Sequence, residues 1–308
     1  MKLLIITAIL LTACTITGET TLETEQEEHF NYTLTFCGNE KCLNSLKQQI
    51  SNAHTEIKCA LYNPDEEILA LIEEKSRSIT AEAVVDDSSK TNSHIANKRK
   101  ASGIMHNKFC IFDGRTVWTG SFNARKSRSH DNVITINSTT LARNYIDEFE
   151  ELKGNSSERT TTSTVILNRT VAENYFCPED NCIEMLRKKL ATAERSIYFA
   201  TYSFTHPAIA NELIIKKSEG VRVEGVIEMA GNSQLTTLQD NGINAVKDEN
   251  RETMHNKFFI IDEEIVITGS FNPTRNADKR NDENMLVIHN EEVAGKYIRY
   301  FGDIRQKT

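Results

Sequence analysis

The chain has 308 residues, enough for two ordinary domains or one large domain with a substantial core. Its 26% charged and 39% hydrophobic residues are typical of a folded soluble protein and exclude a disordered chain. Acidic residues outnumber basic ones by 44 to 36, and the net charge of −8 argues against a protein whose whole surface attracts nucleic acid.

The N-terminal segment is predicted to be an export signal followed by a spacer. One lysine precedes an apolar run of about ten residues, which predicts a signal peptide over residues 1–13. Leu11 to Cys14 resembles the lipobox of bacterial-type lipoproteins and makes Cys14 a candidate lipid anchor; the alternative is a plain signal peptide with a chance cysteine. Residues 14–35, rich in Thr and Glu, are expected to form an acidic spacer. We therefore expect an exported protein, anchored by lipid to the outer face of the cell membrane or secreted.

The rest of the chain is an internal repeat of two similar copies. Residues 36–62 match residues 176–202 at a constant offset of 140, and the segment MHNKF recurs at an offset of 149. The predicted organisation is copy one over residues 36–154, a Ser/Thr-rich linker over 155–175 and copy two over 176–308.

Helices and strands alternate within each copy. Copy one ends in an apolar stripe over residues 141–152 that predicts a helix. In copy two, residues 183–193 predict a helix, 197–202 and 221–227 predict strands, and 293–304 predict a final helix. This alternation indicates an α/β fold with helices packed on a mostly parallel or mixed sheet.

Each copy carries the same six residues at the same spacing. Such fixed identities arise by chance at roughly one start position in tens of millions, so the motif is specific. The copies have diverged widely elsewhere, which points to a function for these positions. They are His106, Lys108, Asp113, Gly120, Ser121 and Asn123 in copy one, and His255, Lys257, Asp262, Gly269, Ser270 and Asn272 in copy two.

The spacing brings phosphate-binding groups together. Residues i and i+2 of a strand point to the same face, so each histidine projects beside its lysine, and each serine beside its asparagine. Cations and hydrogen-bond donors suit phosphate oxygens, and an imidazole can act as base or nucleophile. The candidate phosphate-binding residues are Lys108, Lys257, Ser121, Asn123, Ser270 and Asn272.

The motif resembles the signature of the phospholipase D superfamily, H-x-K-x4-D followed by G-S-x-N, across nearly the whole mature chain. The resemblance implies two α/β/α sandwiches related by a pseudo-twofold axis, with one shared active site. It also implies that one histidine forms a phosphohistidine while the other acts as acid and base. No metal and no cofactor are expected, because the sequence shows no carboxylate cluster or spacing suited to a divalent ion. We count Asp113 and Asp262 with the catalytic motif but expect them to act structurally.

A carboxylate after each G-S-x-N segment is expected to orient an imidazole. Copy two supplies Glu283, and copy one supplies the shorter Asp131. Because an orienting carboxylate raises the basicity of an imidazole, this asymmetry favours His255 as the nucleophile and His106 as the acid/base.

The seven cysteines have several predicted roles. In an exported protein the two C-x4-C pairs, Cys37 with Cys42 and Cys177 with Cys182, favour local disulfides; a four-thiolate zinc site is the alternative. Cys59 and Cys110 fall in predicted core strands and are expected to be buried free thiols. Four N-x-S/T tripeptides are candidate glycan acceptors, at Asn31, Asn137, Asn155 and Asn168.

The substrate is narrowed by resemblance and by local charge. Copy two looks most similar to the small metal-independent endonucleases of the superfamily, and basic residues flank both motifs. These are Lys98, Arg99, Lys100, Arg125, Lys126, Arg128, Arg275, Lys279 and Arg280. We therefore expect an exported nuclease, a dimer-like pair within one chain that needs no protein partner. A phospholipase D acting on lipid headgroups is the alternative, and a non-catalytic surface phosphate-binding protein is a third reading.

Overall fold

The computed structural model describes residues 28–38, 40–154, 163–228 and 234–307. Within copy one the elements follow in the order β1 (Asn31–Phe36), α1 (Lys41–Asn52), β2 (Glu56–Leu61), α2 (Glu66–Lys75), β3 (Thr80–Asp86), β4 (Ala96–Arg99), β5 (Lys108–Phe112), β6 (Thr116–Gly120), β7 (Ser129–His130), β8 (Asn132–Asn137) and α3 (Thr139–Leu152).

Copy two repeats most of this order, with one strand added before it and two further helices. Its elements are β9 (Thr164–Leu167), β10 (Thr170–Cys177), α4 (Cys182–Ala191), β11 (Ser196–Thr201), α5 (Pro207–Ser218), β12 (Arg222–Ile227), α6 (Leu235–Asp240), β13 (Asn244–Lys247), β14 (Thr253–Met254), β15 (Lys257–Ile261), β16 (Ile265–Gly269), α7 (Arg275–Lys279), β17 (Glu283–His289) and α8 (Glu291–Arg305).

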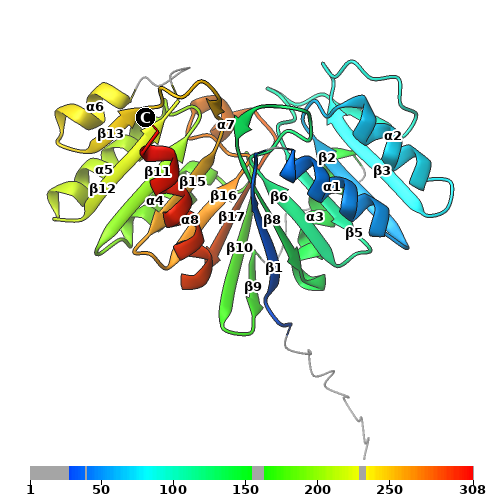
Figure 1. Cartoon of the computed structure of the whole chain (residues 1–308), viewed down its shortest axis with the longest axis horizontal. Helices are drawn as coiled ribbons and strands as arrows, with labels where there is room; N and C mark the ends of the chain where they lie inside the picture. The colour runs from blue at the N-terminus through cyan, green and yellow to red at the C-terminus, as the bar shows by residue number, and fades with distance from the viewer. Residues whose placement is uncertain (1–27, 39, 155–162, 229–233, 308) are drawn as a thin grey trace, which may run out of the picture.

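Each copy is built on one mixed sheet with the same strand order. The first sheet runs β1-β8-β6-β5-β2-β3-β4, and the second runs β9-β10-β17-β16-β15-β11-β12-β13. β2, β3 and β4 pair in parallel, as do β11, β12 and β13, whereas the other neighbours are antiparallel. The predicted duplicated α/β fold is confirmed, and the two sheets meet near β6, β8, β16 and β17 (Figure 1).

Helices cover both faces of each sheet. In copy one, α1 and α2 pack with the outer face of the sheet, and in copy two α4 and α5 do the same. The inner faces, together with α3 and α8, form one continuous apolar core that spans both copies. The stripe predicted over residues 141–152 is this buried face of α3. Because the copies share a core, they are held as one body.

The structure corrects two predicted boundaries. The spacer was expected to reach residue 35, but Asn31–Phe36 forms β1, an edge strand that pairs antiparallel with β8. The linker was expected to cover residues 155–175, but β9 and most of β10 lie within it. In both segments, abundant Thr hid a short alternation of apolar residues. The candidate anchor Cys14 and the candidate acceptor Asn155 lie outside the described residues.

Three disulfides join the six cysteines of the described residues. The two local pairs are confirmed as Cys37–Cys42 and Cys177–Cys182. The expectation of free thiols at Cys59 and Cys110 was wrong, because these residues are direct partners on the antiparallel strands β2 and β5 and form a disulfide. Copy two places Phe199 and Phe259 at this same cross-strand position, as a stacked pair with centroids 5.7 Å apart.

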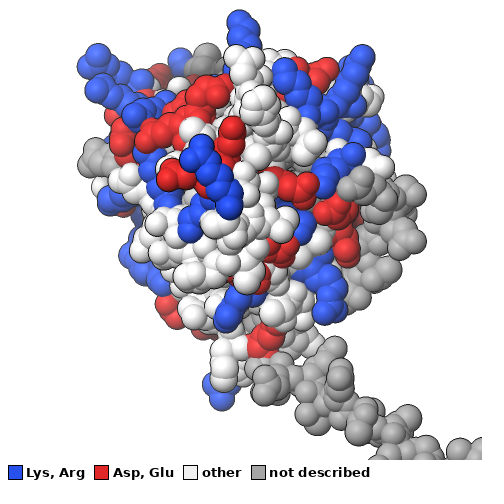
Figure 2. Space-filling model, turned by 90° about the vertical axis from the view of Figure 1, so that its right-hand side faces the viewer, with Lys and Arg blue, Asp and Glu red and all other residues white. Residues whose placement is uncertain are grey.

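Charged side chains of both signs are interspersed over the surface. On the face that lies over α2 and β3, acidic and basic residues alternate without a single dominant sign (Figure 2). Among the described residues, no helix is long and apolar enough to cross a membrane. The net charge of the chain therefore says little about any one part of its surface.

Candidate active site

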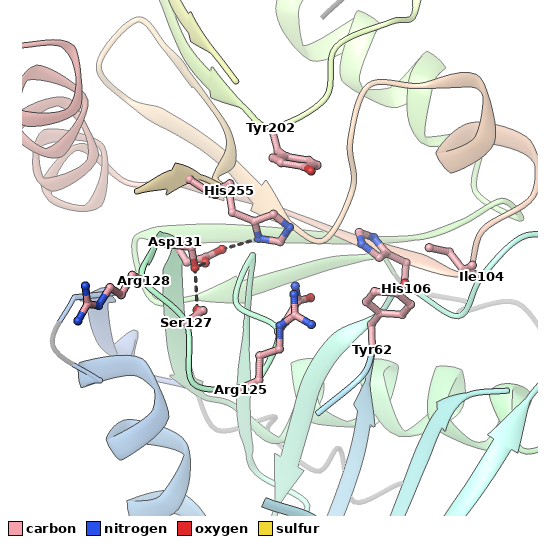
Figure 3. Close-up of a pocket in the computed structure, with 12 residues that line it drawn as sticks. Tyr62, Ile104, His106, Arg125, Ser127, Arg128, Asp131, Tyr202 and His255 are labelled. Carbon is pink, nitrogen blue, oxygen red and sulfur yellow. Dashed lines mark hydrogen bonds and ion pairs between the residues drawn. The ribbon is translucent and has the colours of Figure 1, made fainter. Parts of the chain in front are cut away.

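The two signature histidines lie in one pocket between the copies. His106 lies two residues before Lys108, the first residue of β5. His255 lies two residues before Lys257, the first residue of β15. Both imidazoles line a cavity of about 440 Å³ (Figure 3). The fold thus brings two motifs, 149 residues apart in the sequence, into a single site.

Each imidazole is oriented by a carboxylate of the other copy. Nδ1 of His106 lies 2.8 Å from Oε2 of Glu283, and Nδ1 of His255 lies 2.8 Å from Oδ1 of Asp131. Sequence reasoning treated each copy by itself and favoured His255 as the nucleophile because copy two carries the glutamate. The structure gives that glutamate to His106, so this ground for choosing His255 is lost.

The carboxylates are in turn held by side chains of their own copy. The hydroxyl of Ser121 donates to Oδ1 of Asp131, and the hydroxyl of Ser270 donates to Oε2 of Glu283, each over 2.6 Å. Both serines are fully buried. In this structure their only hydroxyl protons are donated to the carboxylates, and the predicted contact with phosphate stays a prediction.

A second donor holds the far oxygen of each carboxylate. The side-chain amide of Asn281 donates to Oε1 of Glu283 over 3.2 Å, and the hydroxyl of Ser129 donates to Oδ2 of Asp131 over 2.5 Å. Each donor stands two residues before its carboxylate. Neither residue was predicted from the sequence, although each occupies the same position relative to its carboxylate in the two copies.

Both imidazoles are neutral near neutral pH. Burial lowers the pKa of His106 to about 4, although the charge of Glu283 opposes the shift. Burial also lowers the pKa of His255; the charge of Lys257 adds to this shift, and Asp131 opposes it. A neutral ring that donates its Nδ1–H to a carboxylate leaves a lone pair on Nε2, which is the atom available for attack or proton transfer.

The carboxylates remain ionised. Burial by itself raises the pKa of Asp131, but the charge and hydrogen bond of His255 outweigh it and lower that pKa to about 2. The pKa of Glu283 is likewise lowered by His106 against the effect of burial. Two fixed negative charges therefore face the two imidazoles and favour protonation of either ring once a reaction requires it.

The signature lysines are buried next to the histidines. Nζ of Lys108 donates to the carbonyl oxygen of His106 over 2.7 Å, and Nζ of Lys257 donates to that of His255 over 2.6 Å. Burial lowers the pKa of Lys108 well below its ordinary value and that of Lys257 to about 8. Neither lysine is among the residues that line the cavity. Their contact with phosphate oxygens stays a prediction.

The signature asparagines face the pocket region more directly. Asn123 lines the central cavity, and its buried Oδ1 has no hydrogen-bond partner among the described residues. Asn272 lines an adjoining cavity, and its Oδ1 accepts the backbone N–H of Ser203 over 3.3 Å. A side-chain amide has N–H groups that can donate to a phosphate oxygen, and this contact stays a prediction for both residues.

Asp113 and Asp262 are not among the residues that line the central cavity. Each stands in the turn between the two strands that follow the histidine, with φ of +53°. Their carboxylates accept backbone N–H groups, from His54, Thr55 and Glu56 in copy one and from Glu194, Arg195 and Ser196 in copy two. This places them as structural members of the motif.

Two tyrosines flank the imidazoles, and the sequence analysis did not single them out. The ring of Tyr62 meets His106 edge-on at 5.0 Å between centroids, and that of Tyr202 meets His255 at 4.9 Å. Both line the cavity from opposite sides (Figure 3). They are the last matched residues of the repeat with offset 140, which is the signal that could have identified them.

The crossing of the carboxylates is fixed by the contact between the copies. Asn132, next to Asp131, donates its amide to Oδ1 of Asn256 in copy two over 2.9 Å. Asn284, next to Glu283, donates to the hydroxyl of Thr119 in copy one over 2.8 Å. The strand residue next to each carboxylate thus bonds across the pseudo-twofold axis, and this contact holds the carboxylate against the histidine of the other copy.

The central cavity continues on both sides into a groove. A cavity of about 570 Å³ shares Ser127, Arg128 and Ser129 with it, and a cavity of about 560 Å³ on the other side shares both signature histidines. Polar side chains dominate the two outer cavities. Among them are Glu40, Lys126, Arg128 and Glu252 on one side, and Ser203, Thr205, Thr274, Arg275 and Asn276 on the other.

The residues near the groove give no metal-binding set. Within the described ranges, no three His, Cys, Asp or Glu side chains are grouped so that they could hold a metal ion. The charged side chains that line the central cavity are those of Arg125, Arg128 and Asp131.

Comparison with known proteins identifies relatives of this site. A family model described as "Cardiolipin synthase, PLD-like domain" matches residues 46–153 and again residues 186–305. A protein named phospholipase D from Rickettsia conorii is 35% identical over 137 residues, which cover 43% of this chain and 68% of that protein. A mitochondrial cardiolipin hydrolase from Xenopus tropicalis is 30% identical over 138 residues, which cover 42% of this chain and 66% of that protein.

Solved structures also match both copies together. The phosphatidylserine synthase of Haemophilus influenzae Rd KW20 superposes with a TM-score of 0.70, over 90% of this chain and 88% of that one, at 15% sequence identity. At that identity the likeness shows the shared fold alone.

Proposed function

The chain belongs to the phospholipase D superfamily and is a phosphodiester hydrolase, and on that premise we propose that its substrate is nucleic acid, cleaved without a metal ion. The observation that carries this proposal is the polar groove that passes through the histidine pair and continues on both sides of it. A substrate that extends in both directions from the scissile phosphate fits such a groove.

The chemical character of the groove supports this substrate. Arg125 and Arg128 line the central cavity, and Arg275 lines one arm. Arginine side chains hold phosphate groups of a nucleic-acid backbone without reading its sequence. Among the described residues, the large apolar side chains that are exposed are Ile166 and Ile215, and neither lines the groove.

The proposed reaction has two steps at one phosphorus. The negative charge of the bound phosphodiester raises the pKa of the second histidine, which takes up a proton on Nε2 from solvent when the substrate binds. Nε2 of the first histidine forms a bond to phosphorus, and the bond from phosphorus to the leaving oxygen breaks while the second histidine gives that oxygen its Nε2 proton. In the second step, the deprotonated histidine takes a proton from water, whose oxygen bonds to phosphorus and releases the first histidine. The second histidine regains the proton it gave, so the cycle closes.

We propose that His106 is the nucleophile and His255 the acid and base. A nucleophile must be unprotonated, and burial together with Lys108 and Lys257 keeps the pKa of His106 low. His255 is slightly more exposed, and the negative charge of a bound phosphodiester raises the pKa of both rings. This reverses the roles that the sequence favoured, because Glu283 serves the other imidazole.

A phospholipid substrate is the second candidate. The names of two matched relatives, phospholipase D and cardiolipin hydrolase, favour it. A lipid headgroup also carries a phosphodiester, and the chemistry proposed above applies to it unchanged.

One assay separates these substrates. The full chain is incubated in excess EDTA with single-stranded DNA, RNA, cardiolipin vesicles and phosphatidylcholine vesicles, with the H106A/H255A variant as the blank. We expect cleavage of nucleic acid. Turnover of lipid without cleavage of nucleic acid would overturn the nuclease proposal, and loss of all activity in EDTA would overturn the metal-independent mechanism.

A matched charge variant tests the role of the groove. Replacing Arg125 and Arg128 by Ser should weaken binding to DNA and RNA of any sequence and flatten its salt dependence. Replacing the exposed Arg222 and Arg299, which do not line the groove, should leave that salt dependence as it is. Equal effects of the two pairs would mean that the groove does not hold the backbone.

We also propose that the enzyme works outside the cytoplasm, tethered through Cys14. Three disulfides support an oxidising location. Cell fractionation tests this proposal: the native chain is expected with membranes, and a Cys14→Ala variant should lose acylation. A native chain that stays in the cytoplasm would contradict export.

A further inference from the structure

Both catalytic carboxylates stand at the very start of their strands. Asp131 precedes β8, and its carbonyl oxygen accepts the backbone N–H of Cys37 over 2.8 Å. Glu283 is the first residue of β17, and its register partner is Cys177. On their other sides, the ladder pairs with β6 and β16 begin two residues later, at Val133 and Met285. A cysteine is therefore the strand neighbour of each carboxylate residue.

Each of these cysteines is tied to the beginning of a packed helix. Cys37 follows β1 and bonds to Cys42 in the first turn of α1, and Cys177 ends β10 and bonds to Cys182, the first residue of α4. Cys42, Cys177 and Cys182 are buried. Strand ends and edge strands open most readily, and β1 is an edge strand. The disulfides fasten the two points at which opening would disturb the carboxylates.

We propose that these two disulfides are positioning elements of the active site. Cys37–Cys42 fixes Asp131 and, through it, His255 of the other copy; Cys177–Cys182 fixes Glu283 and, through it, His106. The inference rests on the proposed phosphodiesterase mechanism and extends it to cysteines outside the pocket. Without its disulfide, each carboxylate keeps its place in the chain but loses its fixed orientation.

The test compares two paired variants of the full chain, C37S/C42S and C177S/C182S. Turnover of bis(p-nitrophenyl) phosphate is followed across pH. We expect kcat to fall roughly tenfold or more in each, with KM nearly unchanged, because orientation and not binding is lost. Since each carboxylate raises the pKa of its imidazole, each pair should move an acidic limb to lower pH: C177S/C182S that of kcat/KM, which reports the nucleophile, and C37S/C42S that of kcat, which reports the base that activates water. Wild-type kcat and wild-type limbs in both variants would overturn the proposal.

The third disulfide supplies a matched control. Cys59–Cys110 closes a loop with a sequence separation of 51, against 5 for each small disulfide, and touches neither carboxylate. A C59A/C110A variant should therefore lose more thermal stability than either serine pair while keeping kcat and the pH profile. A change of pH profile in this variant equal to that of the serine pairs would mean that general loosening, and not positioning, is responsible.

A second readout does not depend on turnover. NMR titration of His106 and His255 should show a lower pKa for His255 in C37S/C42S and for His106 in C177S/C182S, each with the other ring unchanged. If C37S/C42S does not fold, mild reduction of the folded wild-type chain replaces it, because Cys37 is partly exposed whereas Cys59, Cys110, Cys177 and Cys182 are fully buried. If C177S/C182S does not fold, the C177A/C182A variant takes its place. Absence of diester turnover by the wild type would refute the proposed function, whereas unchanged histidine titrations would refute the positioning role.

Discussion

Oε2 of Glu283, in the second copy, lies 2.8 Å from Nδ1 of His106, in the first. The mirror pair of Asp131 and His255 repeats this relationship at the same distance. Each catalytic imidazole therefore depends on the other copy for its orientation, its tautomer and the charge beside it. Neither half of the chain contains a complete catalytic unit.

Replacing Glu283 by Gln should disturb His106 selectively. Glutamine keeps the size of the side chain but removes the charge that raises the pKa of His106, so that pKa should fall below about 4. The acidic limb of the kcat/KM profile should move to lower pH, and kcat should fall roughly a hundredfold or more because the tautomer is no longer fixed. The exposed Glu291 supplies the control: E291Q should match the wild type. An unshifted acidic limb in E283Q would argue against this pairing.

The assignment of the nucleophile can be tested by trapping. p-Nitrophenolate leaves without protonation, so H255A should still react once with bis(p-nitrophenyl) phosphate and then stall as a phosphohistidine. We expect a burst of one equivalent, with the phosphoryl group mapped by mass spectrometry to the peptide that contains His106. A burst in H106A instead, mapped to His255, would restore the roles favoured by the sequence.

The buried His106 should make stability depend on pH. Its pKa falls from 6.5 to about 4 on folding. Between pH 6.5 and 4, His106 is therefore protonated in the unfolded chain but neutral in the folded chain. The free energy of unfolding should therefore decrease as pH falls from 6.5 to 4, by about 3 kcal/mol from this group. Urea titrations at several pH values should show this pH-dependent loss of unfolding free energy in the wild type and not in His106→Gln. Parallel curves over that range would show that His106 titrates normally.

Gly225 should be intolerant of any side chain. It is the register partner of Phe199 in the parallel pair of β11 and β12, and a Cβ at this position would lie 2.0 Å from Cζ of that ring. At the matching position copy one pairs Cys59 with Ala83, so a smaller residue on β2 leaves room for a methyl group. Gly225→Ala should lower the free energy of unfolding by about 1–3 kcal/mol, as overpacking does. Unfolding measured for A83G, which only removes a methyl group, gives the comparison; a G225A chain as stable as the wild type would contradict the steric argument.

The duplicated fold and the motif residues could be predicted from sequence because they are local patterns. The spacing of His106 and Lys108 fixes their common face, and the apolar stripe over residues 141–152 fixes a buried helix face. The disulfides of the two C-x4-C pairs followed from proximity in the chain. The disulfide between Cys59 and Cys110 could not be predicted in this way, since predicting it requires knowing the register of β2 against β5.

The crossed carboxylates could not be predicted, because they depend on how two similar surfaces meet. Nothing in either copy alone distinguishes a carboxylate that serves its own histidine from one that serves its partner. The hydrogen bonds of Ser121 and Ser270 could not be predicted for the same reason: spacing places a hydroxyl near the motif, but only packing shows which acceptor takes its proton. Tyr62 and Tyr202 were visible as matched positions but lacked a chemical reason to be chosen.

The claim that two motifs make one active site is tested most directly by single histidine variants. Turnover of bis(p-nitrophenyl) phosphate under multiple-turnover conditions is measured for H106A, for H255A and for H54A, in which an exposed histidine outside the groove is removed. The account predicts wild-type turnover in H54A and loss of all measurable steady-state turnover in each of the other two. About half of the wild-type rate in either H106A or H255A would show two independent sites and contradict it.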